Sequence, residues 1–145
     1  MTLAVLMWLC LIVISGLLVS MIFFAAVVAP SVFHFLDEAP AGRFLRGFFP
    51  RYYIFGIGMS LAPAVLLSVL QRPFESWAMI LIAAGFLFSR QYLTPRINEA
   101  RDKAQAGDET SAHRFKTLHK LSVVVNLVQM VVLVGILVRV GPFGL

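Results

Sequence analysis

The sequence predicts an all-α integral membrane protein: a bundle of four transmembrane helices, with a short interfacial helix between the first two. Three observations support this. Hydrophobic residues make up 60% of the 145 residues and charged residues only 13%, whereas soluble domains carry about 25% charge. Long apolar stretches alternate with short segments containing charge, glycine or proline. Lys and Arg gather in only some of these segments, as they do in cytoplasmic loops.

Composition also limits the function. The net charge of +5 is typical of nucleic-acid binding in a soluble protein, but in so apolar a chain it fits basic residues facing anionic lipid. The lipid bilayer is therefore the expected partner, and nucleic acid is not. The single cysteine, Cys10, excludes an internal disulfide and a Cys-x-x-Cys site. The length suits one integral membrane domain over residues 1–145.

The first apolar stretch is long enough to require a break. Residues 1–36 contain no charged side chain, and one continuous helix would measure roughly 54 Å against a hydrocarbon core of about 30 Å. Pro30 is the natural place to end it, because the residue before a proline avoids the helical conformation. We therefore expect the first helix at about residues 3–28.

The connector over residues 30–50 predicts the interfacial helix. Its segment Arg43-Phe-Leu-Arg-Gly-Phe-Phe puts apolar side chains on one helical face and Arg43 and Arg46 on another. An ordinary loop with aromatic anchors is the alternative. The second transmembrane helix follows at about residues 52–71, where Gly56, Ser60 and Ala64 recur at four-residue spacing and favour close approach of another helix.

The third helix is expected at about residues 75–106 and the fourth at about 111–139. The uncharged part of the third, residues 76–89, is shorter than a crossing, so Arg90 would lie about 9 Å inside the lipid boundary. Beyond it we expect a water-exposed extension with a Glu99–Lys103 pair. Gly107-Asp108 predicts the turn, and Thr110 or Ser111 would cap the fourth helix.

Orientation follows from the basic residues. Ten of the twelve fall on one side of the predicted membrane and two, Arg72 and Arg139, on the other. The positive-inside rule then makes the loops between helices 1 and 2 and between helices 3 and 4 cytoplasmic, with both termini outside. We expect the plasma (inner) membrane.

The candidate functional site consists of polar residues that are expected to lie within the membrane. An arginine within a membrane helix is usually paired or functional, although Arg90 could also snorkel toward water. On the fourth helix Phe115, His119, Ser122, Asn126 and Gln129 follow helical spacing and share a face. Asn126 would lie at the depth of Arg90, so a hydrogen bond between them is predicted. Interhelical packing is the alternative role for this stripe.

These residues define two candidate sites. A ligand-binding pocket opening to the cytoplasm would use Arg90, Arg96, Arg101, His119, Ser122 and Asn126, and the arginines would favour an anionic group. Haem or a metal could use His34 and His119, but no Glu-x-x-His or His-Glu-x-x-His motif accompanies them. No nucleophile–base arrangement is visible, which favours a non-enzymatic role.

Several motifs resemble a known family of small membrane proteins. They are Ala29-Pro30 with Phe33, Gly47-Phe-Phe-Pro-Arg-Tyr-Tyr, Leu93-Thr-Pro-Arg-Ile-Asn-Glu-Ala-Arg-Asp, and Phe115 with Leu118-His119 and Asn126. The chain resembles the transmembrane-protein-205-like family, also called domain of unknown function 4149. That resemblance implies four membrane helices without an established activity. The layout is more remotely similar to copper-resistance D-like membrane proteins, some of which bind haem, but the histidine expected in their first helix is not matched unless His34 replaces it.

Three functions stay open at this point. The first is non-enzymatic binding or transport of a small ligand. The second is a haem- or metal-dependent membrane oxidoreductase, and the third is a structural or assembly role. Four helices are few for a transport path, so the sequence also leaves a homo-oligomer open.

Overall fold

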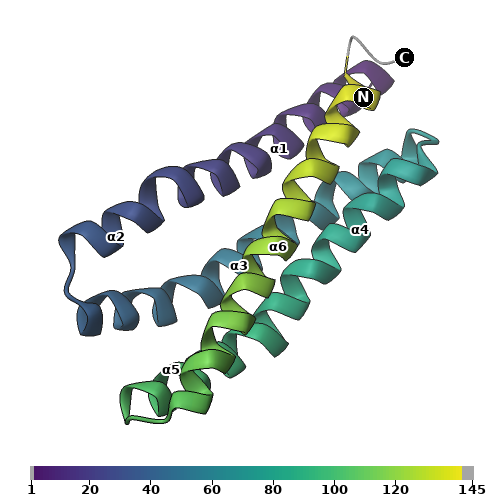
Figure 1. Cartoon of the computed structure of the whole chain (residues 1–145). Coiled ribbons are helices and arrows are strands. Elements are labelled where there is room, and N and C mark those ends of the chain that lie inside the picture. Colours follow the sequence, from purple (N-terminus) through teal and green to yellow (C-terminus); the bar gives the residue numbers. More distant parts are fainter. Residues whose placement is uncertain (1, 142–145) are drawn as a thin grey trace.

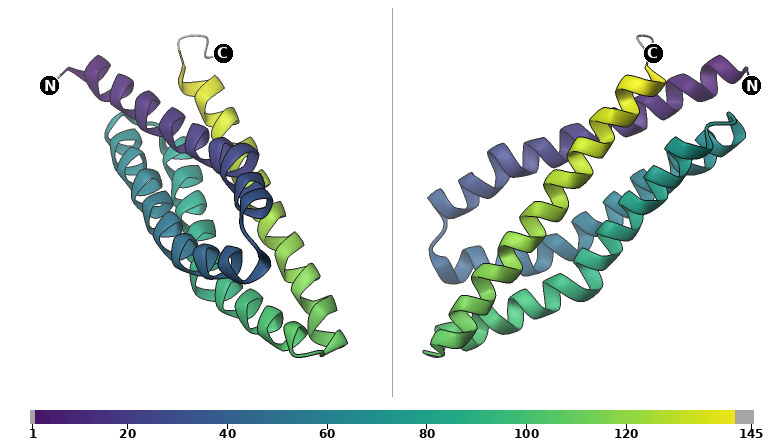
Figure 2. Two further views of the ribbon diagram at one scale, coloured as in Figure 1. Left: turned by 90° about the vertical axis from the view of Figure 1, so that its left-hand side faces the viewer. Right: turned by 45° about the vertical axis from the view of Figure 1, so that its right-hand side comes forward.

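The computed structural model describes residues 2–141, which form four long helical rods joined by short turns (Figure 1). The rods are α1 (Leu3–Phe23) continued by η1 (Phe24–Val28) and α2 (Ala29–Phe35); α3 (Glu38–Val69); α4 (Pro73–Phe88) continued by η2 (Ser89–Leu93) and α5 (Thr94–Gln105); and α6 (Glu109–Val140). Successive rods run in opposite directions. The start of α1, the end of α6 and the α3–α4 turn therefore lie at one end of the molecule (Figure 2).

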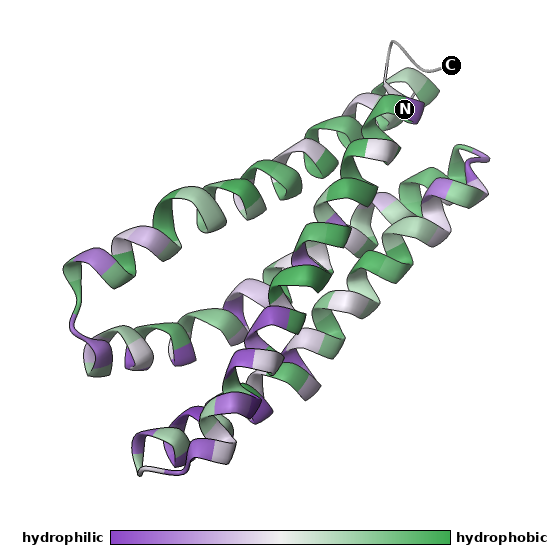
Figure 3. Ribbon diagram, in the orientation of Figure 1, coloured by the Kyte–Doolittle hydropathy of each residue, from purple (hydrophilic) through white to green (hydrophobic). Residues whose placement is uncertain are grey.

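The rods are apolar over most of their length. Three of them are long and apolar enough to cross a membrane: Leu3–Phe35, Glu38–Val69 and Glu109–Val140. Many large apolar side chains on these rods face outward, including Ile12, Val65 and Val131. Hydrophilic residues gather at the end that holds the α5–α6 turn (Figure 3). This is the surface of a membrane-associated helical protein, because water disfavours so much exposed apolar area.

Small residues bring α3 and α4 close together, as their spacing predicts. Ser60 and Ala64 are buried, and Gly56 faces the ring of Phe86 so closely that a Cβ at Gly56 would lie 2.8 Å from it. Ser76 of α4 also donates to the carbonyl oxygen of Ala64 at 2.8 Å. This contact holds the second and third rods side by side.

The predicted end of the first helix before Pro30 is wrong. The rod continues to Phe35 through the π-helical turn η1, in which the Ala29 amide donates to Phe24, five residues back. The same arrangement recurs in η2, where the Thr94 amide donates to Ser89, just before Pro95. A proline lacks an amide hydrogen and crowds the carbonyl four residues earlier. We infer that the wider π-turn gives that carbonyl room, so each helix survives its proline.

The separate interfacial helix is also wrong. Residues 38–51 are the first part of α3, which continues across Pro50 and Pro63 to Val69. Phe48 of this segment packs inward, because its ring stacks on Phe24 of η1 with ring centroids 5.0 Å apart. Packing against the first rod thus keeps this segment helical and joined to the second.

The turn between α5 and α6 agrees with its prediction except for the cap. Gly107 has a φ of 96°, a left-handed conformation that favours glycine, and Lys103 pairs with Glu99 at 2.7 Å. The cap is Asp108, whose carboxylate accepts from the Thr110 amide at 3.0 Å, and not Thr110 or Ser111. Ser111 instead donates its hydroxyl to the same carboxylate at 2.5 Å.

A cavity between the rods at the polar end

A cavity of about 1010 Å³ lies between the rods, at the upper limit of the roughly 300–1,000 Å³ of ligand pockets. Its wall is formed by η1 and α2, by the first part of α3, by η2 and α5, and by α6. Its polar side chains are Glu38, Tyr52, Tyr53, Ser89, Thr94, Asn98, Arg101, Gln105, His119, Ser122, Asn126 and Gln129. The rest of the wall is mainly aromatic and aliphatic.

The polar stripe predicted on the last helix lies along this cavity. Phe115, His119, Ser122, Asn126 and Gln129 all belong to the wall. The rings of Phe115 and His119 are nearly parallel, with centroids 6.0 Å apart, while the Ser122 hydroxyl is bonded to the His119 carbonyl of its own helix at 2.7 Å. The spacing of three and four residues was therefore a sufficient signal for this face.

The three candidate arginines do not converge. Arg101 lies in the cavity wall, whereas Arg90 and Arg96 do not. The guanidinium of Arg96 stacks on the ring of Tyr92, 3.5 Å from its centroid. It also donates to the Tyr92 carbonyl at 3.3 Å. Arg96 therefore lies against its own helix.

The predicted hydrogen bond between Arg90 and Asn126 is not formed. The amide nitrogen of Asn126 lies 3.7 Å from the sulfur of Met130, and within residues 2–141 the buried Nε of Arg90 has no partner. The prediction rested on equal depth in the membrane, which does not by itself turn two side chains toward each other. Asn126 lines the cavity, whereas Arg90 does not.

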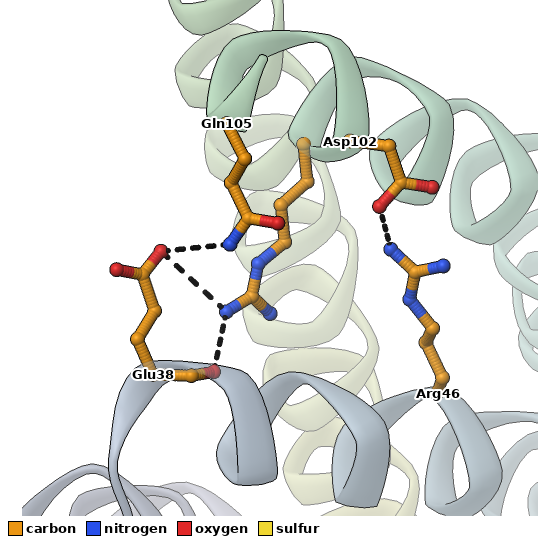
Figure 4. Close-up of polar contacts among 5 residues, drawn as sticks. Glu38, Arg46, Asp102 and Gln105 are labelled. Atoms are coloured by element: carbon orange, nitrogen blue, oxygen red, sulfur yellow. Dashed lines mark hydrogen bonds and ion pairs between the residues drawn. The ribbon is translucent and has the colours of Figure 1, made fainter.

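A set of polar contacts joins α3 to α5 beside the cavity. Arg101 donates to the backbone carbonyl of Glu38 at 3.1 Å, and its Nη2 lies 3.9 Å from the Glu38 carboxylate. Gln105 donates to that carboxylate at 3.0 Å, and Arg46 pairs with Asp102 (Figure 4). The hydrogen bond from Arg46 holds the pKa of Asp102 below its usual value. These contacts join segments far apart in the sequence, so helical spacing alone could not reveal them.

An aromatic wall on the other side was not predicted as part of the site. The ring of Phe24 packs against Tyr52 and Phe49, with centroids 5.2 and 5.4 Å away. Phe49 in turn stacks on Tyr53 at 5.6 Å. All four side chains line the cavity. In the sequence, tyrosines at the start of an apolar segment are typical of interfacial anchors. Their place in the cavity wall follows only from the fold.

The two candidate metal-binding histidines occupy different surroundings. His119 lines the cavity, but His34 does not. The ring of His34 lies edge-on to Phe35, 4.7 Å between centroids, near the end of α2. Within the part of the chain that the structure describes, no three His, Cys, Asp or Glu side chains gather as metal ligands.

The chain matches a known protein family. The family described as "Domain of unknown function (DUF4149)" matches residues 5–106, which include most of the first rod, the whole of the second and third, and both π-turns. Neither a curated protein nor a solved structure matches the chain. Because the family match covers more than half of the chain, the protein belongs to the DUF4149 family.

Proposed function

We propose that the protein crosses the plasma membrane four times, with its polar end in the cytoplasm and both termini outside. The rod α4–η2–α5 connects α3 to α6, two helices that are each able to span a bilayer. It also exposes Trp77, Leu81 and Leu87, as a lipid-facing helix does. Ten of the twelve basic residues lie toward the polar end, which supports the orientation.

We further propose that this protein binds a small amphipathic molecule and is not an enzyme. The observation that carries this proposal is the cavity of about 1010 Å³ at the polar end, with the α6 stripe in its wall. A space of that size between packed helices is much larger than ordinary packing defects, which seldom exceed a water molecule. Its mixed wall suits a molecule with one polar and one apolar part.

The alternatives explain less of the geometry. A packing role accounts for Gln129, which is buried and bonded to α4, but not for His119 and Asn126, which face the open space. A haem- or metal-dependent oxidoreductase using both His34 and His119 would need them at one centre, whereas only His119 lines the cavity.

Filling the cavity from α2 tests this function. Ala29 lines the cavity, and the neighbouring Ala26 is exposed and does not. Native mass spectrometry of the protein purified from its own membranes should detect a bound small molecule in the wild type and in the Ala26→Phe control. The Ala29→Phe variant should lose it. Equal occupancy in all three proteins, or no bound molecule in the wild type, would overturn the proposal.

A further inference from the structure

The cavity wall carries little net charge. Its charged side chains, within residues 2–141, are Glu38 and Arg101, and these two pair with each other. The guanidinium of Arg101 packs against Gly42, where a Cβ would lie 2.9 Å from its Nη1, and its side chain is only 16% exposed. Arg101 therefore already joins α5 to α3. A bound anion would lack an unpaired cation in the described wall to offset the cost of its desolvation.

Two neutral polar groups of the wall have unmet hydrogen-bonding capacity. The hydroxyl oxygen of Tyr52 is buried and has no partner within the described residues. The amide nitrogen of Asn126 has the Met130 sulfur as its partner, at 3.7 Å, and a thioether is a weak acceptor. Leaving a buried donor unpaired is unfavourable. A ligand with acceptor oxygens would satisfy both groups.

The rest of the wall suits a flat ring. Phe24, Phe49, Tyr52 and Tyr53 form one continuous aromatic surface through the contacts described above. The Phe115–His119 pair of α6 adds a second. Aromatic rings prefer offset-stacked or edge-to-face contacts with other rings, so these surfaces favour a planar ring over a flexible acyl chain.

One flank of the cavity lies between α2 and α6. Within the described residues α2 contacts η1 and α3 but not α6, and the two helices diverge toward the polar end (Figure 1). Three exposed apolar residues of the wall border this gap: Phe33, 62% exposed on α2, and Val123 and Leu127, 44% and 53% exposed on α6. An apolar rim favours entry from the bilayer rather than from water.

We propose that the cavity takes an uncharged, ring-bearing amphiphile with acceptor oxygens, which enters from the bilayer between α2 and α6. Tyr52 and Asn126 donate to its acceptors, and the aromatic wall of η1 and α3 packs against its ring. This inference rests on the proposed binding function and specifies its ligand class. It also replaces the anionic ligand that the arginines predicted, because those arginines lie elsewhere or are already paired.

Fluorescence quenching in phosphatidylcholine nanodiscs tests the ligand class. The native Trp8 and Trp77 are replaced by Phe, and Phe49→Trp places a reporter in the wall. Decylubiquinone represents the uncharged ring class, and 9,10-dibromostearate represents an anionic chain without a ring; both quench tryptophan. A second reporter, Phe23→Trp, replaces an exposed residue that lies outside the cavity wall. It measures simple partitioning into the lipid.

The proposal predicts that quenching by decylubiquinone saturates at the Phe49→Trp reporter. At the Phe23→Trp reporter, quenching should keep rising with probe concentration. Quenching by dibromostearate should not saturate at either reporter. Saturable binding of dibromostearate without saturable binding of the quinone would overturn the ligand class and leave the binding function standing. If neither probe saturates, the ligand class falls, and the Ala29→Phe comparison decides separately whether the binding function also falls.

Removing a donor tests the assigned contacts. Asn126→Leu and the nearly isosteric Tyr52→Phe should each raise the Kd for decylubiquinone by about five- to tenfold, the loss expected for one hydrogen bond. Thr117→Val is the matched control, since the Thr117 hydroxyl bonds the His113 carbonyl of its own helix and lies outside the wall. Unchanged binding in both donor variants would overturn the assignment.

Discussion

Gln129 shows how one residue of the polar stripe serves packing between helices. Its Nε2 donates to the carbonyl oxygen of Ile82 in α4 at 2.9 Å, and the side chain is 6% exposed. This contact depends on Gly85, because a Cβ there would lie 2.8 Å from the same nitrogen. Gly85 is thus the residue that lets α6 approach α4 at this point.

Gly85→Ala should therefore destabilise the protein. The added methyl group must displace Gln129 or push the two helices apart, and such overpacking costs about 1–3 kcal/mol. Gly135→Ala on α6 is the control, because nothing lies within 4 Å of its new Cβ. Unfolding of the two variants in mixed detergent measures the difference. Equal stability of both would contradict the packing described for Gly85.

Single residues also mark how far the sequence could predict the site. The stripe on α6 follows from spacing along one helix, and all five of its members line the cavity. The partner of Arg101 does not follow from spacing, because Glu38 is 63 residues away and the contact exists only once α3 lies beside α5. Likewise, Arg90 in a membrane helix suggested a hydrogen-bonded pair with Asn126, whereas its Nε has no partner within residues 2–141.

At the scale of elements, the π-turn η1 explains why the predicted end of the first helix was wrong, and η2 shows the same device at Pro95. The rule that a helix ends before proline is a tendency of local sterics, and both Pro30 and Pro95 follow a π-turn that keeps the helix intact. The surrounding bilayer strengthens this outcome, since it offers no water to a broken backbone. Both π-turns also border the cavity, through Phe24, Ala25 and Ser89, as such turns often border functional sites.

The α5–α6 turn gives a prediction at this scale. Asp108 caps α6, and the Ser111 hydroxyl that donates to its carboxylate holds its pKa below the usual value. A carboxylate with a lowered pKa stabilises the fold above its unfolded pKa of about 3.9, and this contribution is lost as pH falls through the folded pKa.

Asp108→Ala should accordingly lower the melting temperature at pH 7, and its difference from the wild type should shrink in acid. Thermal melts of both proteins between neutral and acidic pH measure this. Thr110→Val is the control, because only the backbone amide of Thr110 bonds the cap, and it should melt like the wild type at each pH. A difference between Asp108→Ala and the wild type that does not change with pH would exclude the charged cap.

On the scale of the whole molecule, polar contacts fasten the rods at both ends. Arg139 of α6 donates to Glu75 of α4 at 2.9 Å at the end that holds the termini. Arg46 and Asp102 join α3 to α5 at the other end. Between them the first rod packs against α3 and α6 along α1, and its α2 segment diverges from α6. The fold therefore leaves one flank of the cavity without a covering helix.

Cysteine labelling tests the four-pass arrangement. Gln71 lies in the α3–α4 turn and Asp108 in the α5–α6 turn, so only the rod α4–η2–α5 separates them. In a Cys10→Ala background, a membrane-impermeant maleimide should label Gln71→Cys in intact cells. It should label Asp108→Cys only after permeabilisation. Labelling of both positions from outside would contradict a crossing by this rod.

The central claim is that the space between the rods at the polar end is a ligand site. The most direct measurement is an experimental structure of the protein purified from its native membrane. We expect continuous non-protein density between Asn126 and the aromatic wall at Phe49, with α2 still apart from α6. A space closed by α2 packing onto α6, without residual density, would contradict the claim.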